Sequence, residues 1–207
     1  MSTKTALIVI DMQKGFINEA SAQCIRGAKA TVPACAAVIN HCREQNIPVF
    51  FVTRRYRTDG SDVEHTRFES WRDGGRAMSQ DCRPEISADA PEEFGICDRD
   101  YQIIKPRYSA FFGTELDLIL RRLGVNTIVL AGATTPNCIR TTCYDGISLE
   151  YNVAVLSDCT SSNTEEIQQS NLRDMANVGA QILTSAEFIS GAEIKDTVSL
   201  ARENVLR

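Results

Sequence analysis

The chain has 207 residues, a length within the range of one α/β domain. Hydrophobic residues make up 43% and charged residues 24%, so the chain has enough apolar material for a core and lacks the composition of disorder. A formal net charge of −5 argues against nucleic acid or an anionic membrane as the main partner. No apolar run reaches the roughly 20 residues of a membrane span, and the amino terminus lacks a signal-peptide cleavage pattern. We therefore expect a cytoplasmic protein.

Short apolar runs alternate along the chain with longer segments of helical periodicity. In chain order, the sequence predicts a strand at 6–11, a helix at 31–46, strands at 48–53 and 101–105, a helix at 114–124, a strand at 127–132, a helix at 139–150, a strand at 152–158, a helix at 166–179 and a strand at 180–185. The nearly continuous apolar character of the strands predicts burial on both faces, as in a parallel sheet. The polar, weakly periodic interval 54–100 is expected to be loop with a short helix.

This alternation predicts a three-layer, doubly wound, Rossmann-like α/β fold around a mostly parallel six-stranded sheet. No repeat, low-complexity tract or linker divides the chain, so residues 1–207 are expected to form a single domain. The carboxyl-terminal stretch 192–207 is compatible with a helix, and the sequence does not indicate whether it packs on its own domain or on a neighbour.

The eight cysteines are expected to be reduced thiols. No two of them have the C-x-x-C spacing of zinc ribbons and thioredoxin-like sites. A chain of this length without an export signal is a poor candidate for a disulfide framework. Most of the thiols are therefore expected to be buried, with one available for chemistry. They stand at positions 24, 35, 42, 82, 97, 138, 143 and 159.

Three residues capable of chemistry follow predicted strands, and ligands of doubly wound folds bind at the carboxyl ends of the strands. Asp11 ends "LIVID", Lys105 ends "YQIIK", and Cys138 lies in the turn after "TIVLAG". Each alone has an ordinary explanation: a strand-end cap, a solvated charge and a buried packing residue. Together they form a base, a cation and a nucleophile.

The position of Cys138 favours a reactive sulfur. If a helix begins near residue 138, its free N–H groups and its dipole favour the thiolate form of Cys138. A nearby Lys105 ammonium would have the same effect. The same N–H groups suit an oxyanion hole, in which each donor typically contributes roughly 3–4 kcal/mol.

Three segments resemble the signatures of one family. "VIDMQKGF" at 9–16, "IIKPRYSAFFGTEL" at 103–116 and "VLAGATTPNCIRTTCYDG" at 129–146 are similar to those of the isochorismatase-like cysteine hydrolases, in the same order and spacing. The resemblance extends over roughly residues 5–190. It implies a catalytic triad of Asp11, Lys105 and Cys138.

The resemblance also implies a particular turn before the cysteine. It places a cis peptide bond between Ala133 and Thr134, within the small-residue stretch "GATT". The backbone N–H groups of Thr134 and Cys138 would then form the oxyanion hole.

The family has two branches, and the residues present favour one of them. One branch hydrolyses C–N bonds of amides and ureido compounds through a thioester, whereas the other cleaves a vinyl ether and lacks the cysteine. Because Cys138 is present, the resemblance implies the amidohydrolase branch. We expect no metal ion or other cofactor, because the ligand types and spacing of a His-rich metal site are absent. The family's nicotinamidases carry Asp-x-His after the second strand; here that region reads "TRRYRTDGSDVEH", which offers Asp59, Asp62 and His65 but not the motif.

Arginines near the predicted site suggest an anionic substrate. "RRYR" at 54–57 follows a strand, Arg67 and Arg72 lie downstream, and Arg107 is close to Lys105. Such a cluster is often only a solvated face, but an arginine fork suits a substrate carboxylate. "TTPNCIR" also resembles the form found in N-carbamoylsarcosine and maleamate amidases, which implies a carboxylate-bearing amide or carbamoyl (ureido) compound. The predicted substrate-binding residues are Phe16, Arg54, Tyr56, Trp71, Tyr108 and Thr135, with Phe112 as a further aromatic candidate.

Two other classes of protein remain open from these residues. A non-catalytic small-molecule-binding protein on the same fold has no need of acid, lysine and cysteine together. A thiol redox protein could use Cys143, but its helix face matches that of Cys138 poorly. Family members are commonly dimers or tetramers, so the resemblance implies a homo-oligomer.

Overall fold

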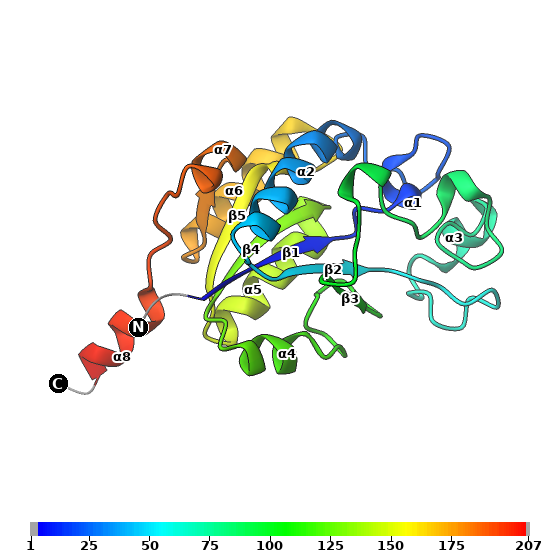
Figure 1. The fold of residues 1–207 in the computed structure, drawn as a ribbon. Helices are drawn as coiled ribbons and strands as arrows, with labels where there is room; N and C mark the ends of the chain where they lie inside the picture. The colour runs from blue at the N-terminus through cyan, green and yellow to red at the C-terminus, as the bar shows by residue number, and fades with distance from the viewer. Residues whose placement is uncertain (1–3, 206–207) are drawn as a thin grey trace.

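The computed structural model describes residues 4–205, and within them six strands form one parallel sheet in the order β3-β2-β1-β4-β5-β6 (Figure 1). All five neighbouring pairs run parallel. The winding direction reverses between β1 and β4, which is where doubly wound sheets hold their ligands. The strands are β1 (Thr5–Ile10), β2 (Val49–Thr53), β3 (Tyr101–Ile104), β4 (Thr127–Ala133), β5 (Asn152–Ser161) and β6 (Gln181–Leu183). The predicted fold class is confirmed.

The four predicted helices are present, each within three residues of its predicted start. The described helices are α1 (Lys14–Ile17), α2 (Ala28–Glu44), α3 (Phe68–Asp73), α4 (Leu116–Leu123), α5 (Arg140–Ser148), α6 (Glu165–Asn177), α7 (Ser185–Ile189) and α8 (Thr197–Val205). Short α1 and α7 were not predicted, because four or five residues show no clear period. For α7 a signal existed: Thr184 and Glu187 form a capping box.

Helices cover both faces of the sheet, which accounts for the apolar strands. Along β1, Ala6, Ile8 and Ile10 pack in the core that contains residues of α4, α5 and α6. Leu7 and Val9 point the other way, into the core with α2 and α7. Figure 1 shows α2 and α7 on one side of the sheet and α4 and α5 on the other. Because successive side chains of a strand alternate between faces, burial on both sides leaves no polar position.

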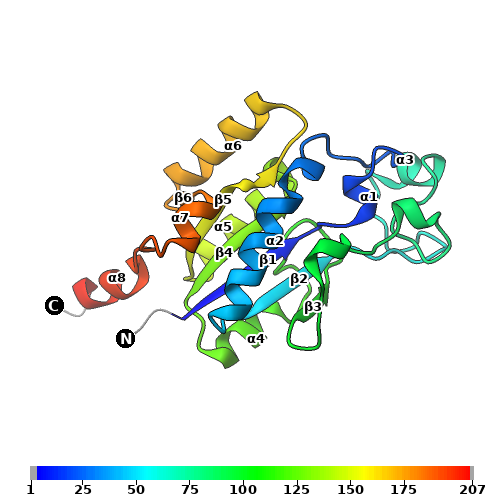
Figure 2. The ribbon, with the colours of Figure 1, turned by 45° about the horizontal axis from the view of Figure 1, so that its top comes forward.

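Residues 54–88, together with Phe16 of α1, contribute a second, smaller core beyond the carboxyl ends of β1 and β2, whereas Phe94 packs in the core with α2 (Figures 1 and 2). The expected short helix is α3, and the Trp71 indole at its end donates to the Ala77 carbonyl at 2.9 Å. The apolar core itself was not predicted, since its members are scattered along the chain. The buried members are Phe16, Tyr56, Val63, Trp71, Ala77, Met78 and Ile86.

Gly132 brings β1 and β4 into close contact at the carboxyl edge of the sheet. It pairs with Ile10 and has a φ of +119°, a conformation that side chains disfavour. A Cβ added there would lie 2.0 Å from the Ile10 carbonyl oxygen. Only glycine allows this approach, which places the residue after Ile10 beside the turn that follows β4.

Helix α8 projects away from the sheet, near the described amino end of the chain (Figure 2). None of its residues is buried, and Leu200 is 56% exposed. Across residues 4–205, no helix combines the length and the apolar character needed to cross a membrane.

Candidate active site

The three residues predicted as a triad lie together at the carboxyl edge of the sheet. Lys105 Nζ is 2.8 Å from Asp11 Oδ2 and 3.5 Å from Cys138 Sγ, so the ammonium joins acid and thiol. Their exposed fractions are 1% for Asp11, 2% for Lys105 and 4% for Cys138. Charges buried to this extent are costly unless they are paired, as these are.

Backbone hydrogen bonds that extend the sheet hold Asp11 and Lys105 in place. Asp11 N–H donates to the Val52 carbonyl at 2.9 Å, and Lys105 N–H donates to the Thr53 carbonyl at 2.9 Å. Asp11 then turns the chain out of the strand with a φ of +53°, a left-handed conformation that aspartate tolerates better than most residues. Both charged groups thus directly follow strands of the sheet, Asp11 after β1 and Lys105 after β3, and each is bonded to the end of β2 between them.

Cys138 lies within a wide, π-type helical turn, Thr135–Ile139, which precedes α5. The Ile139 N–H donates to the Thr134 carbonyl five residues earlier, at 3.3 Å. The helical backbone therefore starts before Cys138, whereas a start near residue 138 was expected. The bond between Ala133 and Thr134 is cis, at the position that the resemblance indicates.

Arg54 is a second buried cation in the site, and its side chain is fully enclosed. Its Nε lies 3.6 Å from Asp11 Oδ2, and its Nη2 donates to Cys138 Sγ at 3.8 Å. On its other side the guanidinium forms an ion pair with Glu64 and donates to Tyr56 Oη at 3.2 Å. Arg54 thus contacts both the acid and the thiol of the triad.

Gln13 holds the backbone of Arg54. Its Oε1 accepts from the Arg54 N–H at 2.8 Å and its Nε2 donates to the Arg54 carbonyl at 2.7 Å. Sequence reasoning identified neither Gln13 nor Glu64 as part of the site. Gln13 lies in the "VIDMQKGF" segment and was within reach, whereas nothing near Glu64 distinguishes it from a surface acid.

The surrounding charges act on the ionisable groups in opposite directions. Burial lowers the pKa of the Arg54 guanidinium, but the nearby Asp11 carboxylate and Cys138 sulfur raise it by more. The pKa of the guanidinium therefore lies above its ordinary value. Burial raises the pKa of Tyr56, against the lowering effect of Arg54 and Arg67. The guanidinium therefore stays charged and the phenol stays neutral.

Other buried cysteines lack such cations. Burial raises the pKa of Cys42 and of Cys143 to about 12 each, so both are protonated at neutral pH. Within residues 4–205 every cysteine is a free thiol, as expected. Cys138 differs from Cys42 and Cys143 because two positively charged side chains donate to its sulfur.

The aromatic residues predicted to bind substrate occupy different environments. Phe16, Tyr56 and Trp71 are buried in the small core beyond the ends of β1 and β2. Tyr108 is half-buried, and the Arg54 guanidinium lies over its ring, 5.3 Å from the centroid. Phe112 is 61% exposed, and no contact with the triad is shown for it.

Thr135 anchors the turn rather than facing the triad. Its hydroxyl lies 2.6 Å from Gln168 Oε1 and 3.0 Å from the Ser161 carbonyl, which attaches the turn to α6 and β5.

The residues after β2 do not suit a metal ion. The Arg54 guanidinium already occupies the space between the carboxylates of Asp11 and Glu64. Asp59 pairs with Arg57, and Asp62 accepts the Arg57 N–H at 3.0 Å. In the part of the chain that the structure describes, no three His, Cys, Asp or Glu side chains gather in a way that could hold a metal.

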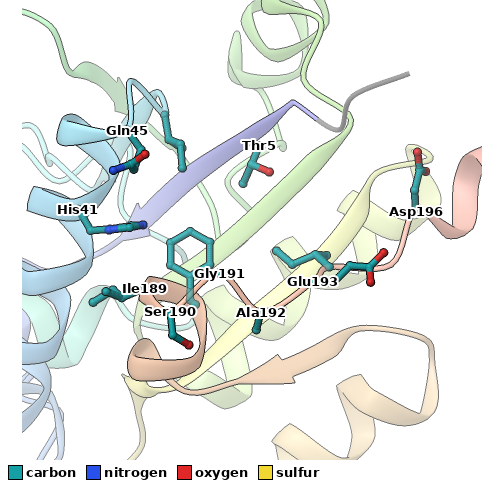
Figure 3. A pocket seen from close by; sticks show the side chains of 12 residues that line it. Thr5, His41, Gln45, Ile189, Ser190, Gly191, Ala192, Glu193 and Asp196 are labelled. Atoms are coloured by element: carbon teal, nitrogen blue, oxygen red, sulfur yellow. The ribbon is translucent and has the colours of Figure 1, made fainter.

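A groove of about 950 Å³ lies at the opposite, amino-terminal edge of the sheet (Figure 3). It is bounded by Thr5 at the start of β1, by His41 and Gln45 near the end of α2, and by residues 188–194 and 196. Because parallel strands begin at one edge and end at the other, the length of β1 separates this groove from the triad.

The chain is similar to known proteins over most of its length. Residues 5–187 match the isochorismatase domain. An Arabidopsis thaliana protein described as a probable inactive nicotinamidase is 38% identical over 186 residues, covering 89% of this chain and 94% of that protein.

Two crystal structures have the same fold. An isochorismatase family protein from Desulfovibrio vulgaris superposes with a TM-score of 0.84 at 34% identity, over 90% of this chain and 97% of that one. N-carbamoylsarcosine amidase from Thermoplasma acidophilum superposes with a TM-score of 0.71 at 29% identity, over 88% of this chain and 97% of that one. The domain match and these similarities over most of the chain show that this protein belongs to the isochorismatase-like hydrolase family.

Proposed function

We propose that the protein is a cysteine-dependent hydrolase that cleaves a C–N bond of a small amide or carbamoyl (ureido) compound. The observation that carries this proposal is the position of Lys105, whose ammonium lies within 3.5 Å of both the Asp11 carboxylate and the Cys138 sulfur. A cation between an acid and a thiol stabilises the negative charge on either one.

Asp11 is suited to act as the proton acceptor. Its Oδ2 faces two cations, Lys105 Nζ at 2.8 Å and Arg54 Nε at 3.6 Å, whereas no donor within residues 4–205 is bonded to its Oδ1. A buried carboxylate with free lone pairs can accept a proton from a thiol without first breaking another hydrogen bond.

The reaction then proceeds in two stages. Asp11 takes the Cys138 proton, and the sulfur attacks the substrate carbonyl carbon to form a tetrahedral oxyanion, which the Thr134 and Cys138 N–H groups stabilise. The C–N bond breaks as Asp11 returns the proton to the leaving nitrogen. A water molecule, deprotonated by Asp11, attacks the thioester, and the released thiolate takes the proton back from Asp11.

A carboxylate on the substrate has a candidate partner in Arg67. Its guanidinium is half-buried, 5.8 Å from the centroid of Tyr108 and 6.0 Å from that of Phe16, and its Nη1 donates to Gln23. Within the described residues no carboxylate pairs with Arg67, whereas Arg54 is already paired twice. The structural relative from Thermoplasma acidophilum is called an N-carbamoylsarcosine amidase, which supports a ureido acid as the substrate class.

The rival classes have less support. A redox role for Cys143 conflicts with burial, which raises the pKa of this thiol to about 12 and disfavours the thiolate needed for exchange. A purely binding protein fits the name of the Arabidopsis thaliana relative, probable inactive nicotinamidase, but leaves the buried acid, cation and thiol without a use.

The test is ammonia release from nicotinamide, maleamate, N-carbamoylsarcosine, biuret and ureidoacrylate, with and without a chelator. Wild type and Cys138→Ala are compared side by side. We expect chelator-insensitive turnover of one carboxylate-bearing compound that disappears in Cys138→Ala and weakens through KM in Arg67→Met. Turnover that survives in Cys138→Ala, or that the chelator abolishes, contradicts the proposal.

We also propose that the protein is a homo-oligomer. A nine-residue helix such as α8 is too short to be stable without packing, yet none of its residues is buried in one chain. Light scattering after size-exclusion chromatography is expected to give two or four times the mass of one chain. A mass of one chain at micromolar protein concentration contradicts the proposal.

A further inference from the structure

We propose that Arg54 is a positioning residue of the triad, held by Glu64 so that its guanidinium stabilises the Cys138 thiolate together with Lys105. The inference rests on the proposed function and adds to it a role for a side chain that the sequence suggested as a substrate contact. It follows from the contacts of Arg54, all of which are made inside the protein.

The two cations bridge the same pair of groups. Lys105 Nζ lies 2.8 Å from Asp11 Oδ2 and 3.5 Å from Cys138 Sγ. The corresponding distances for Arg54 are 3.6 Å from Nε to Asp11 and 3.8 Å from Nη2 to the sulfur. When the proton moves from Cys138 to Asp11, the negative charge moves from the carboxylate to the sulfur and stays in contact with both cations. Little reorganisation is then needed, which is how a preorganised site lowers a barrier.

The charges of the enclosed groups balance. Asp11 and Glu64 supply two negative charges and Arg54 and Lys105 two positive ones, all on side chains that are at most 4% exposed. Proton transfer from Cys138 to Asp11 leaves this sum at zero. A single buried cation would balance Asp11 but would leave Glu64 unpaired, so Arg54 and Glu64 belong together.

The surroundings fix the direction of the guanidinium. Glu64 pairs with Nη1 of Arg54, and Tyr56 Oη, which lies 3.2 Å from the same Nη1, donates to Glu64 Oε2 at 2.8 Å. The Gln13 amide fixes the backbone at residue 54, and the Tyr108 ring lies against the guanidinium. Because Nη1 contacts Glu64 and Tyr56 and Nη2 contacts Cys138, the guanidinium cannot turn toward a substrate without breaking the Glu64 pair.

The test compares wild type with the double variant Arg54→Met/Glu64→Gln, which removes one charge of each sign and keeps similar side-chain volume. The readout is the pH dependence of Cys138 alkylation by iodoacetamide, resolved by mass spectrometry. The charged and titratable groups that face or surround this sulfur are Asp11 after β1, Arg54, Tyr56, Glu64 and Arg67 after β2, and Lys105 and Tyr108 after β3.

We expect the midpoint of the alkylation profile to rise by about one pH unit in the double variant, because the thiolate loses one of its two cations. Lys105→Met is expected to shift it in the same direction. The matched control is Arg43→Met/Asp100→Asn, which removes a partly buried ion pair at the amino-terminal ends of β2 and β3 and is expected to leave the midpoint unchanged. A midpoint within about 0.3 pH unit of wild type in the folded double variant overturns the proposal.

Arg54→Lys provides a second reading if the double variant does not fold. A single ammonium that pairs with Glu64 cannot also reach the sulfur, so the midpoint is again expected to rise, and an unchanged midpoint overturns the proposal. With a substrate that the wild type hydrolyses, Arg54→Lys is expected to lower kcat with little change in KM. A rise in KM at constant kcat would identify Arg54 as a substrate-binding residue instead. Because alkylation needs no substrate, a failure of the hydrolase proposal is distinguishable from a failure of this one.

Discussion

Replacing Gly132 with alanine tests whether the approach of β4 to β1 builds the site. The new Cβ would lie 2.0 Å from the Ile10 carbonyl oxygen and 2.8 Å from the Ile10 carbonyl carbon and nitrogen. These are backbone atoms, so no side-chain rotation relieves the clash and the two strands must separate at this end. Asp11 follows Ile10 directly and moves with it.

The magnitude follows from three costs. Alanine at a φ of +119° loses about 1–2 kcal/mol. Separating the strand ends weakens about two backbone hydrogen bonds, at about 1 kcal/mol each. Loosened packing around Ile10 adds about 1 kcal/mol. We therefore expect the free energy of unfolding to fall by about 4–5 kcal/mol.

Gly179→Ala is the matched control. Gly179 has a φ of +108°, and an added Cβ there meets nothing within 4 Å, so this variant carries the backbone cost without the clash. It should lose only about 1–2 kcal/mol. The assay is urea unfolding followed by far-UV circular dichroism, with linear extrapolation to water. Equal losses in the two variants would refute the argument from close approach.

Three further predictions concern the thiols and one ion pair. Cys138→Ser should reduce amide hydrolysis at least about a thousandfold while the urea midpoint stays close to that of wild type, and substantial residual turnover would exclude Cys138 as the nucleophile. Iodoacetamide at pH 8 should leave Cys42 and Cys143 unmodified, since burial raises the pKa of each to about 12, and mass spectrometry of the labelled peptides checks this. Burial opposes ionisation of Asp100, but the Arg43 guanidinium outweighs it and holds the pKa of that carboxyl below its ordinary value. A lowered folded pKa stabilises the protein above the unfolded pKa of about 3.9, so Asp100→Asn should cost about 1 kcal/mol at pH 7 and progressively less as the pH falls below about 4. Urea unfolding at pH 7 and pH 3 measures the difference, and a cost that persists at pH 3 contradicts the ion-pair explanation.

The six strands, four helices and sheet type were predictable because their signals are local. A run such as residues 6–10 is apolar at every position only when both faces of the strand are covered, so the pattern itself indicates a parallel sheet between helices. The start of the helical turn around Cys138 was misplaced because its wide, π-type winding, with a hydrogen bond over five residues, leaves no mark in the hydrophobic pattern.

The candidate triad was also within reach of sequence reasoning. Parallel strands end at one edge of their sheet, so the ends of three strands necessarily bring Asp11, Lys105 and Cys138 toward one another. The substrate-facing side chains were not within reach. The sequence suggests Trp71 as a pocket aromatic, yet it fills the small core beyond the ends of β1 and β2. Apolar residues spread over a loop show no period that would separate packing from binding.

By itself, the sequence determined the layers of the fold, the edge of the sheet at which its chemistry lies and the three residues that follow strands ending at that edge. The tertiary structure alone decided what surrounds them: that Gly132 meets the Ile10 backbone, and that Arg54 turns inward between Asp11 and Glu64 while Arg55 and Arg57 face solvent. The physical reason is that a buried charge depends on partners distant in sequence. No local pattern around an arginine reveals whether the chain will bring two carboxylates and a sulfur to it.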